Sequence, residues 1–198
     1  MSRLLDLSDS LFLRFNDLAR TTTALHAPAA AFATYGVALF AALVLLDIWR
    51  RRRASDQRLA AAVWAGLGTV LALAVNQPVA ALVAEARPYA AHPAVLTLVD
   101  RTTDWSFPSD HSVMAGAVTV GLLLVSRRLG VLAAAAAVLM SVTRVYVGAH
   151  YPHDVIAGLA LGGAVAGGGW LLVRLPLTRL VGALRRLPVV HRVLAPAA

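Results

Sequence analysis

Five long apolar segments, separated by short polar stretches, constrain this chain more than any other feature. Each is close to the ~20 residues that an α-helix needs to cross the hydrocarbon core of a bilayer. Apolar residues make up 59% of the chain and charged residues only 14%, which is too little charge to cover a soluble surface. We therefore expect an all-α fold, a polytopic transmembrane bundle of about five spanning helices. The segments are Ala27–Trp49, Leu59–Ala84, Pro108–Ser126, Leu129–Ala149 and Val155–Val173.

The N-terminal stretch has a different pattern. Residues 4–20 place apolar and charged side chains on opposite faces of a helix, which favours an amphipathic helix lying in the membrane interface. A short helix packed on the bundle is an equally good interpretation. We see no domain boundary, so residues 1–198 form one domain, with a bundle over 27–173 and a cytoplasmic tail over 174–198. The apolar stripe consists of Leu4, Leu7, Leu11, Phe15 and Leu18.

The basic residues indicate how the chain is oriented. All 18 are arginines, and the net charge is +8, but they stand at the ends of apolar segments instead of forming one patch, so we expect no nucleic-acid partner. Twelve of them flank one side of the bundle, which the positive-inside rule assigns to the cytoplasm. The loops 87–107 and 150–153 then face outward from a multi-pass protein of the cytoplasmic membrane. The twelve are Arg50 to Arg53, Arg58, Arg127, Arg128, Arg174, Arg179, Arg185, Arg186 and Arg192.

Glycine is frequent in the fifth segment. Gly158 and Gly162, then Gly163 and Gly167, are four residues apart. Small residues at that spacing let helix backbones approach closely, so we expect a tightly packed contact there.

Polar residues that carry chemistry gather at the outer ends of four segments. A single arginine at such a place is often only an anchor that reaches the interface. Histidines and aspartates beside the arginines make that interpretation much weaker. These residues are Arg87, Ser109, Asp110, His111, Arg144, His150 and Asp154.

This set can perform phosphoryl transfer. Two guanidinium forks can hold phosphate oxygens, and Ser109 with the start of its helix can add donors. His150 and Asp154 are four residues apart, with Pro152 favouring a helix start between them. The carboxylate can then hold one ring nitrogen of His150 and leave the other nucleophilic. His111 can protonate the leaving oxygen. The arginines would replace a metal, and no cofactor is expected.

Three sequence blocks extend this interpretation, because together they resemble the type 2 phosphatidic acid phosphatase (PAP2) superfamily. The blocks are Arg87-Pro88, Pro108-Ser109-Asp110-His111 and Thr143-Arg144-(five residues)-His150-(three residues)-Asp154. The resemblance implies that His150 is the nucleophile, Asp154 its orienting carboxylate and His111 the general acid. It implies phosphate-binding roles for Arg87, Arg144 and Ser109. We place Asp110 with them, although it could instead bond a neighbouring loop or tune His111.

Some positions depart from the family pattern. Ala80 stands where the family often has a lysine, Thr143 replaces a serine, and Asp110 replaces a glycine. The Phe-Pro-Ser-Asp-His sequence, with Asn76-Gln77 upstream, resembles the undecaprenyl-pyrophosphate phosphatase branch linked to bacitracin resistance. That resemblance implies a polyprenyl pyrophosphate substrate, converted to the monophosphate carrier that peptidoglycan assembly reuses.

Other functions stay open. The same residues would suit a phosphatase for phosphatidylglycerophosphate, diacylglycerol pyrophosphate or a polyprenyl-phosphoryl sugar phosphate, because only the lipid groove would differ. A small transporter is a remote alternative, since its charges would be spread across the membrane depth. The oligomeric state is not indicated.

Several polar residues have structural alternatives. His153 could complete a metal site with His111, His150 and Asp110, but we expect it at the aqueous rim. Glu85 could pair with Arg87. Asn76 and Gln77 lie within an apolar segment, where a polar pair usually bonds across to another helix.

Overall fold

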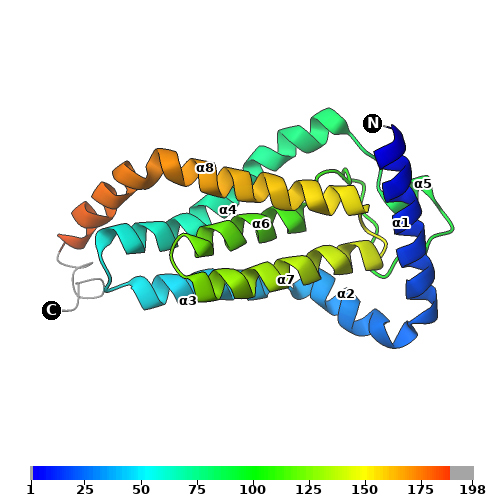
Figure 1. Ribbon diagram of the computed structural model, residues 1–198, viewed down its shortest axis with the longest axis horizontal. Helices are drawn as coiled ribbons and strands as arrows, with labels where there is room; N and C mark the ends of the chain where they lie inside the picture. Colours follow the sequence, from blue (N-terminus) through cyan, green and yellow to red (C-terminus); the bar gives the residue numbers. More distant parts are fainter. Residues whose placement is uncertain (1, 188–198) are drawn as a thin grey trace.

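The computed structural model describes residues 2–187, all of whose regular elements are helices (Figure 1). The expectation of an all-α fold is therefore confirmed. The elements are α1 (Ser2–Thr21), the 3₁₀ turn η1 (Thr23–Leu25), α2 (His26–Tyr35), α3 (Val37–Arg51), α4 (Asp56–Val83), α5 (Pro88–Ala91), α6 (Asp110–Leu123), α7 (Arg127–Tyr146) and α8 (Pro152–Arg185).

Helix α6 lies at the centre of the bundle and packs against α4, α7 and α8. The backbones of α6 and α8 approach each other closely at glycines. A Cβ added to Gly162 would lie 1.9 Å from the carbonyl oxygen of Val113, and one added to Gly116 would lie 2.3 Å from that of Leu159. The close approach expected from glycine spacing in the fifth segment is thus present at Gly162. It brings the N-termini of α6 and α8 to the same end of the bundle.

Residues 2–187 contain three or four candidate membrane spans, so the expected count of five is not confirmed. Three helices are long and apolar enough to cross a bilayer, or four if α2 and α3, which meet at a 48° bend, count as one span. The predicted span Pro108–Ser126 is the exception, because α6 has only 14 residues, or about 21 Å at 1.5 Å per residue. Surrounded by other helices, α6 need not reach both lipid interfaces by itself. A count of five remains a prediction.

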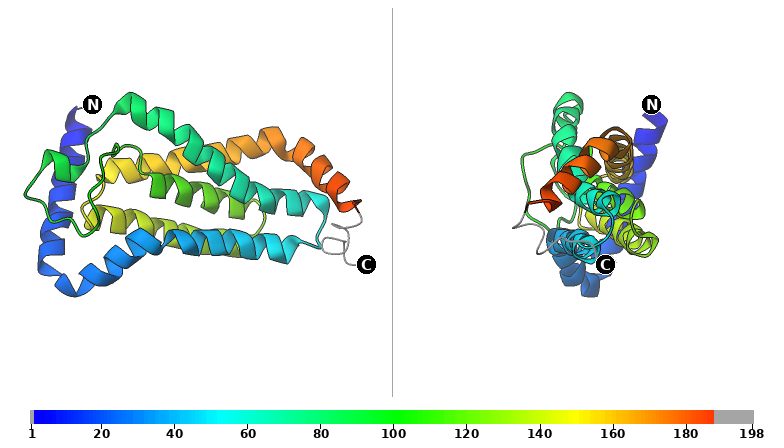
Figure 2. Two further views of the ribbon diagram at one scale, coloured as in Figure 1. Left: turned by 180° about the vertical axis from the view of Figure 1, so that it is seen from behind. Right: turned by 90° about the vertical axis from the view of Figure 1, so that its left-hand side faces the viewer.

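Helix α1 crosses the end of the bundle at a steep angle to the other helices (Figures 1 and 2). Its buried stripe includes Phe12, Asn16 and Ala19, whereas Leu4 and Leu7 are exposed. The apolar stripe read from the sequence therefore mostly faces away from the protein, and a second stripe packs onto the bundle. The helix thus packs on the bundle, as one of the two interpretations has it, and its location in the membrane interface remains a prediction.

The far end of α8 extends into the segment expected to form a cytoplasmic tail, residues 174–198. The helix continues through Pro176 to Arg185, and Arg185 is buried. Its guanidinium donates to the Asp56 carboxylate at 2.6 Å and to the carbonyl oxygens of Ala54 and Arg52 at 2.7 and 2.9 Å. This part of the predicted tail is thus an integral part of the bundle. The remainder of the predicted tail, residues 188–198, lies outside the described residues.

Candidate active site

A polar cavity of about 340 Å³ opens near the end of the bundle that α1 crosses. It brings together residues from α2, α5, α6 and α7 and from the loops after α4, α5 and α7. The two histidines and two arginines singled out in the sequence line this one space. The lining residues are Thr34, Arg87, Tyr89, Val99, Asp100, Thr102, Asp104, Asp110, His111, Arg144, Ala149 and His150.

His150 stands in the turn between α7 and α8, and its ring orientation follows from its partners. Arg87 Nη1 lies 3.1 Å from His150 Nε2. A guanidinium can only donate, so Nε2 must accept and carry the lone pair. The proton is then on Nδ1, which lies 2.9 Å from the carbonyl oxygen of Ser106. The unprotonated nitrogen is the one beside the arginines.

The turn that presents His150 depends on Gly148. Its φ of +80° is one that side-chain-bearing residues rarely adopt, and a Cβ there would lie 2.4 Å from the carbonyl oxygen of Leu96. Glycine removes both obstacles. The chain can therefore turn sharply between α7 and α8 and keep His150 inside the protein.

Asp154 lies behind His150, in the first turn of α8, and is fully buried. Its Oδ2 accepts from the Ser106 hydroxyl at 2.5 Å and the Tyr151 backbone N–H at 2.8 Å, and stands 3.4 Å from His150 Nδ1. Pro152 is the first residue of the helix, as expected from the sequence. The expected His150–Asp154 pair is therefore present, but Ser106, which we did not identify in the sequence, is a partner of both residues.

Burial determines the charge state of His150. Desolvation, opposed by the hydrogen bond to Asp154 and reinforced by the charges of Arg144 and Arg87, lowers the pKa of His150 to about 4. The imidazole is therefore neutral near pH 7, as a nucleophile requires.

Arg87 is held by a carboxylate that we did not identify in the sequence. Its Nε and Nη2 donate to the two oxygens of Asp104 at 3.0 and 2.8 Å, and its Nη1 also donates to the carbonyl oxygen of Ala149 at 3.1 Å. Burial opposes ionisation of Asp104, but hydrogen bonds from Arg87 and Thr102 outweigh it and lower the pKa of that carboxyl to about 2. Arg87 thus pairs with Asp104, whereas Glu85, which could have paired with Arg87, contacts His153.

Arg144 is less completely paired. It is buried, its Nη1 makes one long bond of 3.4 Å to the carbonyl oxygen of Ala33, and its Nε has no hydrogen-bond partner among residues 2–187. A buried cation with a free donor beside a polar cavity is suited to bind an anion. His111, in the first turn of α6, completes the lining and makes no hydrogen bond with the described residues.

Comparison of the sequence with known proteins identifies the family of this chain. The profile of the PAP2 superfamily matches residues 61–176, more than half of the chain, and this range contains the arginines and histidines of the cavity. The chain belongs to the PAP2 superfamily.

The PAP2 relatives include enzymes that act on lipid phosphates. The chain is 33% identical over 120 residues to the undecaprenyl-diphosphatase BcrC of Bacillus subtilis, covering 61% of this chain and 61% of that protein. It is 38% identical over 102 residues to the decaprenylphosphoryl-5-phosphoribose phosphatase of Mycobacterium tuberculosis, covering 51% of this chain and 55% of that protein. The chain thus spans less than two thirds of the length of these relatives.

A solved structure has the same fold. The transmembrane PAP2-type phosphatidylglycerolphosphate phosphatase from Bacillus subtilis aligns over 94% of this chain and 90% of its own, with a TM-score of 0.59 and 18% identity. Together with the long apolar helices, these similarities identify a multi-pass membrane protein with the PAP2 fold.

Two other residues of the PAP2 blocks, Ser109 and Asp110, lie differently with respect to the cavity. The Ser109 hydroxyl is buried without a hydrogen-bond partner among residues 2–187 and is not part of the cavity lining. Asp110 lines the cavity, but its Oδ1 accepts from Asn76 at 2.7 Å and from Gln77 at 3.2 Å. The amide pair therefore bonds across to another helix, as expected. Phosphate contacts by Ser109 and Asp110 remain predictions.

His153 also differs from the expectation. It is half-buried instead of lying at the rim, and it contacts Ser8 of α1 and Glu85. The structure therefore does not place it with His111, His150 and Asp110, and the metal set considered from the sequence is not formed.

Proposed function

We propose that this PAP2 protein is a lipid pyrophosphate phosphatase that forms a phosphohistidine on His150 without a metal in the reaction. The observation that carries the proposal is the lone pair on His150 Nε2, which accepts from Arg87 Nη1 at 3.1 Å at the edge of a cavity that His150, Arg87 and Arg144 line. A neutral nucleophile between two cations is suited to attack an anionic phosphoryl group.

The reaction has two steps. His150 Nε2 attacks the terminal phosphorus, the bond from that phosphorus to the bridging oxygen breaks, and His111 gives a proton to the departing lipid monophosphate. Water then attacks the phosphohistidine, His111 takes its proton, and inorganic phosphate leaves as His150 is restored. Arg87 and Arg144 stabilise the charge on the equatorial oxygens in both steps. Asp154 keeps the proton on Nδ1.

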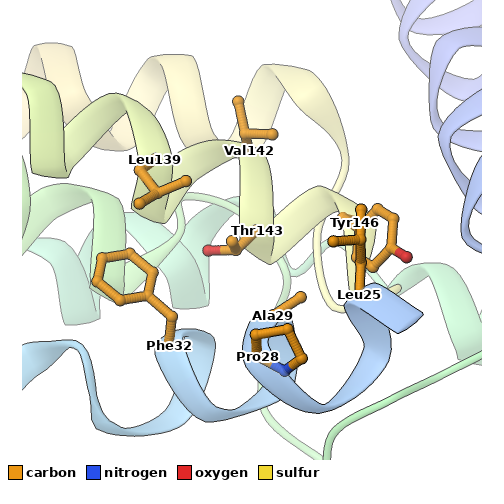
Figure 3. Close-up of a pocket in the computed structure, with 8 residues that line it drawn as sticks. All are labelled: Leu25, Pro28, Ala29, Phe32, Leu139, Val142, Thr143 and Tyr146. Atoms are coloured by element: carbon orange, nitrogen blue, oxygen red, sulfur yellow. The ribbon is translucent and has the colours of Figure 1, made fainter. Parts of the chain in front are cut away.

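The proposed substrate is undecaprenyl or another polyprenyl pyrophosphate, so that the enzyme would recycle the carrier of peptidoglycan assembly. The similarity to an undecaprenyl-diphosphatase supports this choice. An apolar groove of about 370 Å³ between α2 and α7 is in keeping with a lipid chain, because Thr143 in its lining directly precedes Arg144 (Figure 3). Its lining residues are Leu25, Pro28, Ala29, Phe32, Leu139, Val142, Thr143 and Tyr146.

We further propose that the cavity opens at the extracytoplasmic face of the cytoplasmic membrane. The arginine-rich loop after α3 and the end of α8 lie at the opposite end of the bundle (Figure 1). Cytoplasmic placement of that end follows the positive-inside rule.

Phosphate release by the purified protein, with chelator present, tests the proposal. Polyprenyl pyrophosphate should be hydrolysed faster than phosphatidylglycerophosphate or a polyprenyl-phosphoryl sugar phosphate. His150→Ala should lower the rate by more than about 10³-fold, because the nucleophile is gone, and His111→Ala should slow both steps. Faster hydrolysis of another lipid phosphate would show that the proposed substrate is wrong. Substantial turnover by His150→Ala would overturn the mechanism.

A further inference from the structure

The two oxygens of the Asp154 carboxylate have very different surroundings. Oδ2 accepts two hydrogen bonds and faces His150. Oδ1 is buried and has no hydrogen-bond partner among residues 2–187, although His153 Nε2 lies 3.1 Å away. A buried carboxylate oxygen without a donor is costly. Among residues 2–187, His153 is therefore the one positively chargeable group in ion-pair contact with Oδ1, and this oxygen has room for a stronger partner.

Two further metal-ligating groups surround that oxygen. Glu85 Oε2 lies 3.0 Å from His153 Nε2, and ligand atoms of Glu85, His153 and Asp154 all lie within 4.8 Å of one another. Bonds of about 2.0–2.2 Å to a central ion can join atoms at this spacing after small side-chain shifts. One imidazole nitrogen and two carboxylate oxygens, from a loop and a helix start, thus converge on one point.

The His153 ring is held in place for such a role. Its Nδ1 lies 2.8 Å from the Ser8 hydroxyl of α1. Its ring stacks on Phe107 and Tyr151, with centroid distances of 5.8 and 5.6 Å. Histidines that bind metals almost always use their second nitrogen to bond an outer partner, which fixes the ring and its tautomer. Ser8 is in position to be that partner, and an ion would replace the contact that Nε2 now makes with Glu85.

We propose that Glu85, His153 and Asp154 form a binding site for a divalent transition-metal cation, with Zn²⁺ as the best match. Zinc takes imidazole and carboxylate ligands and tolerates three protein ligands with an open fourth position. The site is separate from the phosphate cavity, but its ligand Asp154 also contacts His150, which lines that cavity. The unpartnered Oδ1 is the group that the cation satisfies.

Occupancy of this site affects the nucleophile, a consequence that rests on the proposed function. A cation on Oδ1 withdraws negative charge from the carboxylate, so Asp154 attracts the nearby His150 Nδ1–H less strongly across the 3.4 Å between Oδ2 and Nδ1. The imidazole is then a poorer nucleophile, while Arg87 and Arg144 still bind phosphate. Zn²⁺ therefore lowers kcat and leaves KM nearly unchanged.

Direct binding tests the site without any reference to catalysis. Chelator-treated, full-length protein in detergent would be titrated with Zn²⁺ in a calorimeter, and with Co²⁺ while its visible absorption is followed. Glu85→Gln and His153→Asn should each weaken binding at least about 10-fold, since losing a ligand costs no less than losing an outer partner. Ser8→Ala should weaken it about 10-fold.

The matched control is His92→Asn, which removes the imidazole of an exposed pair in which His92 Nε2 and Asp9 Oδ1 are 2.7 Å apart. Zn²⁺ binding should be unchanged in this variant. Equal affinity of the Glu85→Gln variant and the unaltered chain, or an equal loss in His92→Asn, would overturn the site.

Turnover measurements then test the coupling. Zn²⁺ should reduce kcat of the unaltered chain but not of Glu85→Gln, whose rate in chelator should match that of the unaltered chain. Zn²⁺ binding with no change in kcat would reject the coupling. If Glu85-dependent binding is found in a chain that releases no phosphate from any lipid, the site stands and the proposed function fails.

Discussion

Two buried arginines at opposite ends of the bundle show how differently the same side chain is used. Arg185 and Arg144 are 5% and 8% exposed. Arg185 forms an ion pair with Asp56 at 2.6 Å and donates to two carbonyl oxygens. Arg144 has one long bond to a carbonyl oxygen and no carboxylate at ion-pair distance among residues 2–187. Since burying an unpaired charge is costly, Arg185 is a structural residue, whereas Arg144 is suited to receive an anion from outside.

Of the replacements that test this comparison, that of Arg144 should lower activity the most. Arg144→Lys keeps the charge but loses the planar fork that can bind two phosphate oxygens. We expect kcat/KM for the lipid pyrophosphate to fall by about 10²-fold or more, with little change in the melting temperature. A variant with normal kcat/KM would show that Arg144 does not bind the transferred phosphoryl group.

Asp104→Asn tests whether pairing of Arg87 matters for geometry. The amide can accept one hydrogen bond from Arg87 but no longer holds both nitrogens with a charge. We expect kcat to fall about 10-fold because the guanidinium is misplaced. Thr102→Val, which removes the other side-chain donor to Asp104, is the milder companion variant. Its kcat should lie between that of the unaltered chain and that of Asp104→Asn. An unchanged kcat in Asp104→Asn would show that Asp104 is not needed to position Arg87.

The low pKa of His150 predicts how stability and kcat/KM depend on pH. The pKa of His150 in the folded protein is lowered to about 4, whereas an unfolded chain has the ordinary value of about 6.5. The folded protein is therefore fully stable with respect to this group above about pH 6.5, and it loses stability as the pH falls toward 4. The nucleophile likewise stays unprotonated at pH 6. The limb of kcat/KM assigned to His150 should therefore lie below about pH 5. The free energy of unfolding should be measured against pH for the unaltered chain and for His150→Asn. A loss of stability near pH 6.5 that is present in the first and absent from the second would contradict this assignment.

Arg185→Ala should have the smallest effect on turnover. The variant loses hydrogen bonds to a carboxylate and two carbonyl groups, worth about 1–3 kcal/mol, so the melting temperature should fall. At temperatures where the variant is folded, kcat/KM should stay within about twofold, because the site lies at the other end of the bundle. A large loss of kcat/KM without loss of stability would remove the distinction between the two arginines.

Much of the fold follows from the sequence because membrane helices have a strong local signal. Long apolar segments predicted the helices, and the spacing of His150 and Asp154 with Pro152 predicted the turn at the start of α8. The length of α6 was less predictable. The apolar run from Pro108 to Ser126 does not reveal that the helix begins at Asp110 and ends at Leu123.

The partners of the site residues were much harder to predict. Asp104 and Ser106 lie in the irregular chain between α5 and α6, where no periodicity indicates which way a side chain points. Their contacts with Arg87 and Asp154 depend on the path of that loop. The same is true of His153, because its bond to Ser8 joins residues 145 positions apart. Sequence patterns predict the residues that carry the chemistry, and tertiary packing selects the residues that hold them.

The most direct test of the central claim is to trap the covalent intermediate. The purified protein would be mixed with polyprenyl pyrophosphate radiolabelled in its terminal phosphate, quenched within milliseconds in alkali and mapped by peptide mass spectrometry. We predict an acid-labile, base-stable phosphoryl group on His150, absent from His150→Ala and more abundant in His111→Ala if water attack becomes the slower step. Turnover without a labelled enzyme at any time, or a label on another residue, would contradict the assignment of His150 as the nucleophile.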